Sequence, residues 1–150
     1  MKLSTKSRYS LRILLQLATK YGQESSAIKG RIIAKVQNIS EPYLEQIMIS
    51  LKSAGLVKTI RGCHGGYVLN RAPEDISILD IIELYEGKIK LSDCAEGSNS
   101  NCELLSVCAA TGVWEHLTNV FKNEASNITL DKVLGGKEFG FAGGCYDCSC

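Results

Sequence analysis

The feature that most constrains the fold is a pair of helical patterns, over residues 28–37 and 41–54, separated by only three residues. Apolar side chains recur in both at the spacing of one buried helix face. These inward positions are Ile32, Ile33, Val36, Leu44, Ile47, Met48 and Leu51. Ser40 is suited to cap the second helix because its hydroxyl can accept a free backbone N–H, and Gly55 is suited to end it. Two helices joined by so short a turn predict a helix-turn-helix unit.

A β-hairpin is predicted directly after these helices. Residues 56–60 and 67–69 are short and rich in β-forming side chains, and the segment 61–66 between them contains three glycines. Glycine allows positive φ angles and a close approach of the backbone to a partner. A hairpin that follows a helix-turn-helix predicts a wing.

The rest of the chain is predicted to be helical. An amphipathic helix is expected over residues 7–21, and a helix capped by Ser77 is expected to end at Gly87. A long helix is expected over 102–125, with a short last helix capped by Thr129. The predicted fold class is therefore mostly α: a winged helix-turn-helix with a small β-hairpin wing and a long C-terminal helix.

Three regions are expected along the chain. Residues 1–73 form the winged helix-turn-helix domain, residues 74–134 hold a cysteine-containing loop and further helices, and residues 135–150 form a flexible tail rich in glycine and cysteine.

Charge divides the chain at the same boundary. Residues 1–73 contain 12 lysines or arginines and 3 acids, whereas residues 74–150 contain 5 lysines and 13 acids. A basic half that can neutralise several phosphates is typical of DNA binding. A bipolar protein that is held together by its own charges remains the alternative. The expected electrostatic contacts are Lys2, Lys6, Arg8, Lys29, Arg31, Lys35, Lys52 and Lys58.

The second helix of the predicted helix-turn-helix carries the candidate base-reading side chains. Glu45 can accept a hydrogen bond from cytosine N4, and Gln46 can pair with adenine in the major groove. Tyr43 and Ser40 are within reach of phosphates, and Arg61 of the wing can enter a narrow minor groove. The full set of candidate DNA-binding residues is Lys2, Arg8, Ser40, Tyr43, Glu45, Gln46, Arg61, Gly65 and Gly66.

Cysteines are the second unusual feature, because the chain has seven and only Cys63 lies in the basic half. Cys94, Cys102 and Cys108 follow the spacing C-x7-C-x5-C, and thiolates are the ligands of iron–sulfur clusters. Buried structural cysteines are the alternative reading of this spacing. The tail adds C-x2-C-x-C at Cys145, Cys148 and Cys150. These three are interpreted as reduced thiols, a soft-metal site, a redox pair or a source of one cluster ligand.

Several classes of protein are not indicated. The sequence shows no phosphate-binding loop, nucleophile elbow or acid–base pair, so an enzyme is not expected. No segment approaches the roughly 20 apolar residues of a membrane span, and no signal peptide follows the basic N-terminus. We therefore expect a cytoplasmic protein without a membrane partner.

Several motifs together resemble a known family. They are LSTKSRY at residues 3–9, YLEQ at 43–46, GLV at 55–57, RGxxGGY at 61–67, and the three cysteines of the C-x7-C-x5-C pattern followed by Trp114. Over residues 1–134 the chain resembles the IscR-type winged-helix iron–sulfur cluster regulators, whose relatives include NsrR and CymR.

The resemblance implies a homodimer that binds a roughly palindromic double-stranded DNA operator, and it implies that the long helix crosses its partner in the dimer. It also implies that Cys94, Cys102 and Cys108 hold an iron–sulfur cluster whose state controls DNA binding. We expect a transcriptional repressor, and we favour a [2Fe–2S] over a [4Fe–4S] cluster.

The sequence departs from the family pattern at the fourth cluster ligand. A histidine is expected three residues after the last cysteine, where this chain has Thr111, and some relatives use an acidic residue at position eight, where this chain has Arg8. Glu103, His116, a tail cysteine or solvent are the remaining candidates. Two other functions also stay open: a CymR-like repressor that senses through a protein partner, and a metal- or redox-handling protein that uses the tail cysteines.

Overall fold

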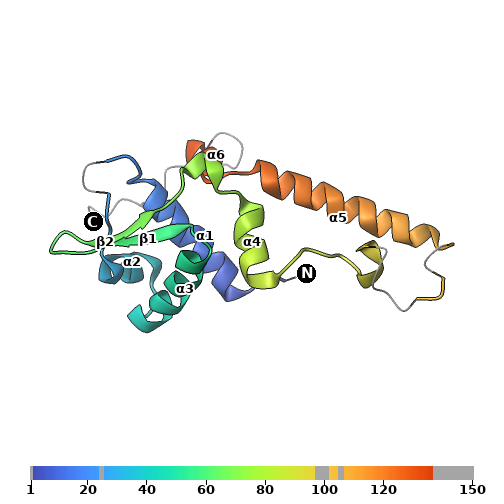
Figure 1. The fold of residues 1–150 in the computed structure, drawn as a ribbon, viewed down its shortest axis with the longest axis horizontal. Helices are drawn as coiled ribbons and strands as arrows, with labels where there is room; N and C mark the ends of the chain where they lie inside the picture. The colour runs from blue at the N-terminus through green and yellow to red at the C-terminus, as the bar shows by residue number, and fades with distance from the viewer. Residues whose placement is uncertain (1, 24–25, 97–101, 105–106, 137–150) are drawn as a thin grey trace.

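The structure is a computed structural model, and it describes residues 2–23, 26–96, 102–104 and 107–136. The elements in chain order are α1 (Thr5–Ala18), α2 (Gly30–Gln37), α3 (Glu41–Ser53), β1 (Val57–Ile60), β2 (Gly66–Leu69), the 3₁₀ turn η1 (Pro73–Asp75), α4 (Ile78–Glu86), the 3₁₀ turn η2 (Asp93–Glu96), α5 (Ala109–Asn127) and α6 (Leu130–Gly135). Figure 1 shows α1, α2, α3 and the hairpin gathered at one end of the molecule, with α5 extending away as an arm.

The helix-turn-helix prediction is confirmed. α2 ends at Asn38, whose φ of 55° turns the backbone into the left-handed region, and α3 begins after Ser40. The Ser40 hydroxyl accepts the Tyr43 N–H at 3.4 Å, as its predicted capping role requires. All four apolar side chains predicted to line the inner face of α3 are buried. The buried residues of α2 are Ile33, Ala34 and Gln37. The Gln37 Nε2 donates to Oε1 of the buried Gln16 of α1 at 2.7 Å.

The predicted wing is also confirmed, as an antiparallel pair with Val57 opposite Leu69 and Ile60 opposite Gly66. Gly62 has the positive φ that was predicted, at 112°, and the other two glycines are explained by close approach. A Cβ on Gly66 would lie 2.6 Å from the carbonyl carbon of Ile28 and closer still to its oxygen. A Cβ on Gly65 would overlap the carbonyl oxygen of Ile60. The partner that approaches these glycines closely is therefore the backbone of the chain itself.

The core forms around α1, and the end of the described chain returns to it. Leu130 of α6 is fully buried in the same apolar cluster as Ile13 and Leu14 of α1. Two backbone hydrogen bonds tie this return to the start of α4: Ile78 N–H donates to Ile128 O at 2.8 Å, and Leu130 N–H donates to Ile76 O at 3.1 Å. α5 is thus anchored to the winged-helix end at its C-terminus.

Three predicted helix starts were wrong. α2 begins at Gly30 rather than 28, because Ile28 pairs with Tyr67 in an isolated antiparallel bridge. α1 begins at Thr5 rather than Ser7, because Ser4 caps it and accepts the Ser7 N–H. The long helix begins at Ala109 rather than 102, because Cys108 has an extended backbone, with φ −85° and ψ 113°, that interrupts helical geometry. The predicted tail was wrong at its start, because Gly135 belongs to α6 and Gly136 caps that helix. The rest of the tail, with its three cysteines, lies outside the described residues. In the described part of the chain, no helix combines the length and apolar character needed to span a bilayer.

Candidate functional site

The outer face of α3 is exposed at the winged-helix end. With 3.6 residues per turn, Pro42, Glu45, Gln46 and Ile49 share the side opposite the buried stripe, and all four are exposed. The structure therefore brings Glu45 and Gln46 together on one accessible helix surface, as predicted. Ile49 was not predicted as part of this surface, because an apolar residue in a helix is usually assigned to the core.

Tyr43 and Ser40 lie at the start of the same helix, but both have contacts within the chain. Tyr43 is half-buried, and its ring meets the ring of Tyr9 edge-on with centroids 5.9 Å apart. The guanidinium of Arg12 lies 5.3 Å from the centroid of the Tyr9 ring. The contact between Tyr9 and Tyr43 holds α1 beside the start of α3, and Arg8 of α1 is exposed. The Ser40 hydroxyl is engaged in the helix cap.

The base of the wing meets the other end of α3. The ammonium group of Lys52 lies 6.0 Å from the centroid of the Tyr67 ring on β2. Burial raises the pKa of Tyr67, and the nearby carboxylate of Glu45 raises it further. Arg61, just beyond β1, is exposed, as is Lys2 near the N-terminus. Basic side chains are thus exposed on the wing, at the N-terminus and on α1.

The last turn of α4 leads into the cysteine segment, by which we mean the residues from Cys94 to Cys108. Two adjacent side chains of this turn, Tyr85 and Glu86, contact α1 and α3. The Tyr85 hydroxyl accepts from Ser10 Oγ of α1 at 2.8 Å and donates to the carbonyl oxygen of Ile47 in α3 at 3.4 Å. Glu86 Oε1 accepts the Ser4 N–H at 2.8 Å and also the Ser7 hydroxyl. No local sequence pattern predicted these long-range hydrogen bonds, which tie the last turn of α4 to α1 and α3.

The hydrogen bonds to Glu86 predict an acid-sensitive contact. The Ser7 hydroxyl, followed by the Ser4 hydroxyl and N–H, lowers the pKa of Glu86 below its ordinary value. A depressed native pKa stabilises the fold above the unfolded-state pKa, and this contribution is lost as pH falls through the native pKa. We expect the wild-type free energy of unfolding to fall more steeply between about pH 5 and pH 3 than that of Glu86→Gln.

Chemical unfolding over this pH range measures the difference. Glu83→Gln is the matched control, since it removes a carboxylate one turn earlier on the same helix. Identical pH profiles for wild type and Glu86→Gln would contradict the role given to this contact.

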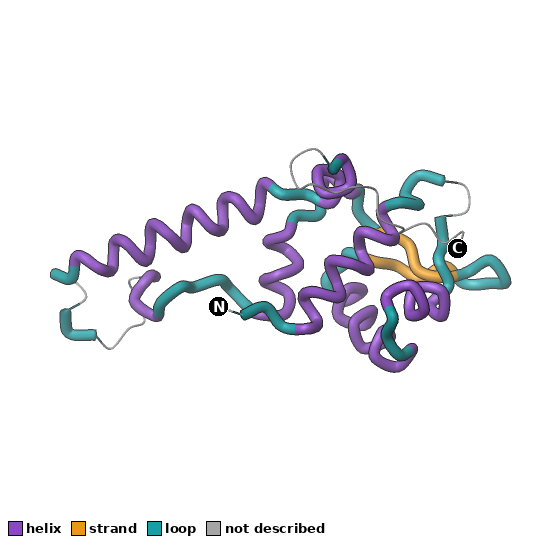
Figure 2. The backbone as a smooth tube through the Cα atoms, turned by 180° about the vertical axis from the view of Figure 1, so that it is seen from behind, coloured by secondary structure: helices purple, strands orange, loops and turns teal. Residues whose placement is uncertain are grey.

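The cysteine segment lies at the opposite end of the long axis from the hairpin (Figure 2). Cys94 lies in η2, which packs beside α5, and Cys108 is the residue from which α5 begins. The Leu91 N–H donates to the buried Thr118 Oγ1 at 3.3 Å, which fixes the approach of this segment to α5. Cys94 and Cys108 are therefore held by two elements that pack together.

The cysteine thiols at this end of the molecule are ligands that soft metals prefer. Cys94, Cys102 and Cys108 are free thiols, and the Sγ of Cys94 lies 2.6 Å from the hydroxyl oxygen of Ser92. Backbone N–H groups of Ala110 and Thr111 lower the pKa of Cys108, which favours the thiolate that binds metals. Within the described residues, no group of three or more cysteine, histidine or acidic side chains is gathered closely enough to hold a metal ion.

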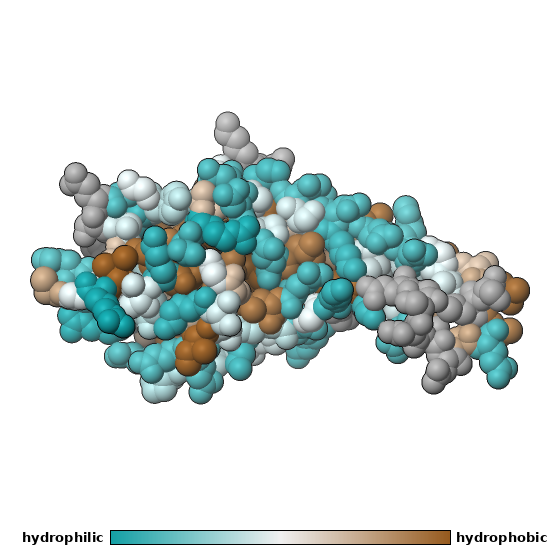
Figure 3. All heavy atoms as spheres, in the orientation of Figure 1, coloured by the Kyte–Doolittle hydropathy of each residue, from teal (hydrophilic) through white to brown (hydrophobic). Residues whose placement is uncertain are grey.

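α5 presents a second exposed surface, which we call the α5 stripe: Val113, Trp114, Leu117 and Val120. Each is between 41% and 55% exposed. The buried residues of this helix, Thr118 and Ala125, lie on a different side of it. Figure 3 shows apolar side chains exposed at the far end of the arm. Such a stripe on a long helix is typical of an association surface.

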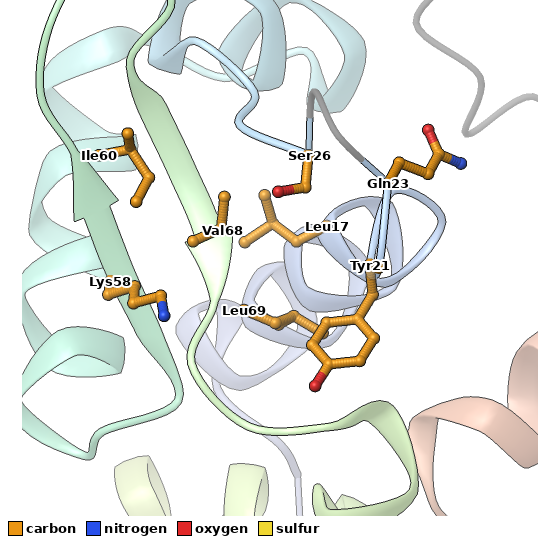
Figure 4. A pocket seen from close by; sticks show the side chains of 9 residues that line it. Leu17, Tyr21, Gln23, Ser26, Lys58, Ile60, Val68 and Leu69 are labelled. Atoms are coloured by element: carbon orange, nitrogen blue, oxygen red, sulfur yellow. The ribbon is translucent and has the colours of Figure 1, made fainter.

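A pocket of about 450 Å³ lies behind the hairpin, between β1, β2 and the end of α1. Figure 4 shows Lys58, Ile60 and Val68 of the hairpin on one side and Leu17 and Tyr21 on the other. Lys58, one of the expected electrostatic contacts, lines it, whereas Ser40, Tyr43, Glu45 and Gln46 do not. The pocket is therefore separate from the exposed face of α3.

Comparisons of sequence place the chain among regulators. The family model for Rrf2, described as an iron-dependent transcriptional regulator, matches residues 3–136. The HTH-type transcriptional regulator CymR of Bacillus subtilis is 39% identical over 131 residues, covering 87% of this chain and 88% of CymR. The HTH-type transcriptional regulator NsrR of Bacillus licheniformis is 34% identical over 134 residues, covering 89% of this chain and 92% of NsrR.

Solved structures agree with the sequence comparison. The structure of CymR, the global cysteine regulator of B. subtilis, matches with a TM-score of 0.75 and 36% identity, over 90% of this chain and 97% of that chain. The structure of T. potens IscR matches with a TM-score of 0.71 and 34% identity, over 97% of this chain and 95% of that chain. These relatives are transcriptional regulators, not enzymes. The chain therefore belongs to the Rrf2 family of winged-helix transcriptional regulators, as its resemblance to the IscR-type proteins predicted.

Proposed function

We propose that this protein is a homodimeric repressor whose binding to a roughly palindromic DNA operator is controlled by an iron–sulfur cluster held by Cys94, Cys102 and Cys108. The observation that carries the proposal is the placement of Cys94 and Cys108 on packed elements at one end of the molecule, with the Cys108 thiolate favoured. A bound cluster, [2Fe–2S] in preference to [4Fe–4S], would supply a redox-active group that joins the three thiolates.

Residues 1–73 form the DNA-binding region in this proposal. Glu45 and Gln46 read bases in the major groove, while Arg61, Gly65 and Gly66 bring the wing to the minor groove and backbone. The positioning contacts to phosphates come from Lys2, Arg8, Ser40 and Tyr43. Residues 74–134 carry the cluster ligands and, through the α5 stripe, the dimer interface.

The route from the cysteines to the DNA surface is α4. Its last two residues, Tyr85 and Glu86, contact α3 and the start of α1 respectively, and the chain then leads from Gly87 to η2 with Cys94. Binding of a cluster by Cys94, Cys102 and Cys108 would change the position of the end of α4 and, with it, that of the recognition helix α3. Because two recognition helices must lie about 34 Å apart along the DNA, or a multiple of that, a small rotation changes operator affinity.

The test is iron and sulfide content, together with the visible spectrum, of the anaerobically purified full chain. Wild type should show a visible chromophore with iron and acid-labile sulfide, and each of Cys94→Ala, Cys102→Ala and Cys108→Ala should lose it. Cys63→Ala, an exposed thiol in the wing, is the matched control and should keep the chromophore. A colourless wild type without iron or sulfide after reconstitution would overturn the cluster proposal.

The similarity to CymR favours one alternative, in which the protein is a repressor that senses through a protein partner. A metal-free preparation with full operator affinity that responds to an added partner would support this alternative over the cluster.

A further inference from the structure

Ile49 is an apolar side chain at the centre of the surface assigned to DNA. It is 63% exposed, although the other large apolar residues of α3 are buried or half-buried. It follows Glu45 by four residues and Gln46 by three, so the three side chains are neighbours on one helix face. No intramolecular packing explains an isoleucine at this position.

A single exposed apolar residue is common on protein surfaces and has no meaning by itself. The position of Ile49 is what indicates a function, because Ile49 shares a helix face with Glu45 and Gln46, whose side chains can hydrogen-bond to base edges. One helical turn advances about 5.4 Å, whereas successive base pairs are about 3.4 Å apart. A helix that places Glu45 and Gln46 on one base pair therefore places Ile49 one or two base pairs away.

The apolar feature of a base edge in the major groove is the 5-methyl group of thymine. We infer that Ile49 is a specificity-determining residue that contacts a thymine methyl group in each operator half-site, a role that rests on the proposed DNA-binding face of α3. Glu45 and Gln46 recognise hydrogen-bonding groups, and Ile49 adds recognition of a methyl group that neither of them can provide.

The experiment first selects duplexes from a random library with the full-length wild-type chain, purified anaerobically. Each thymine of the selected site is then replaced by deoxyuridine, which removes only the methyl group and keeps the base pair. Burial of one methyl group contributes a factor of about 4 in affinity. We expect one thymine per half-site whose replacement weakens wild-type binding by about this factor, and by about 16-fold when both half-sites are changed.

Three variants decide the assignment. Ile49→Ala should bind the thymine and deoxyuridine operators with equal affinity, whereas Gln46→Ala and the α3 surface control Ser53→Ala should keep the difference. Equal wild-type affinities at every position, a site without thymine, or a methyl effect that persists in Ile49→Ala would overturn the inference alone. If no duplex is selected, the DNA-binding assignment of α3 fails, and the inference fails with it.

Discussion

Leu117→Glu is expected to convert the proposed dimer into a monomer and to weaken operator binding by at least about 100-fold, since two linked half-site contacts become one. Leu117 lies within the α5 stripe, whose four apolar side chains are each between 41% and 55% exposed. In a two-fold symmetric interface the substitution occurs twice, so two carboxylates enter one apolar contact. Each must be desolvated there without a compensating partner.

Sedimentation of wild type and variant measures the association, and titration of a selected operator measures the affinity. Asn119→Glu is the matched control, because it adds the same charge to the same helix on the side opposite the α5 stripe. A monomeric wild type, or a dimeric Leu117→Glu variant with full operator affinity, would contradict the assignment of the α5 stripe as the dimer interface.

Gly66→Ala is expected to reduce the free energy of unfolding by about 3 kcal/mol. The new Cβ would overlap the carbonyl group of Ile28, and a backbone group cannot rotate aside as a flexible side chain can. Moving the strands apart would break two hydrogen bonds between Ile28 and Tyr67, of 3.0 and 2.9 Å. Each contributes about 1 kcal/mol, and the steric overlap adds a similar or larger cost.

Gly112→Ala is the informative control for this variant. Gly112 lies within α5, and an added Cβ would have no heavy atom within 4 Å. Alanine is the better helix former, so this variant should gain up to about 1 kcal/mol. Urea unfolding of both variants gives the comparison, and equal stabilities of Gly66→Ala and wild type would contradict the close approach at the base of the wing.

Local sequence patterns predicted the elements of this fold well. The stripe on α3, the Ser40 cap and the glycine-rich hairpin are short-range features, and each was found where it was expected. The start of α5 was wrong because apolar periodicity alone did not reveal the extended backbone of Cys108. Helix ends depend on the geometry of one or two residues, which periodicity does not report.

Sequence patterns predicted the arrangement of candidate residues only where those residues lie on a single element, the outer face of α3. Glu45 and Gln46 were placed correctly, since they lie on one helix face. The hydrogen bonds of Tyr85 and Glu86 join residues separated by between 38 and 82 positions, and no local pattern encodes such pairs. Ile49 was missed although helical periodicity places it opposite the predicted buried stripe, because an apolar residue in a helix is usually assigned to the core.

Control of DNA binding by a cluster is tested most directly by comparing the operator affinity of one anaerobic preparation before and after cluster reconstitution, with iron and sulfide measured in each sample. We expect the two affinities to differ by at least about tenfold, within the usual range of coupling between two sites. Cys108→Ala should show no such difference. Equal affinities of the cluster-free and cluster-loaded wild-type protein for every selected operator would contradict control by the cluster.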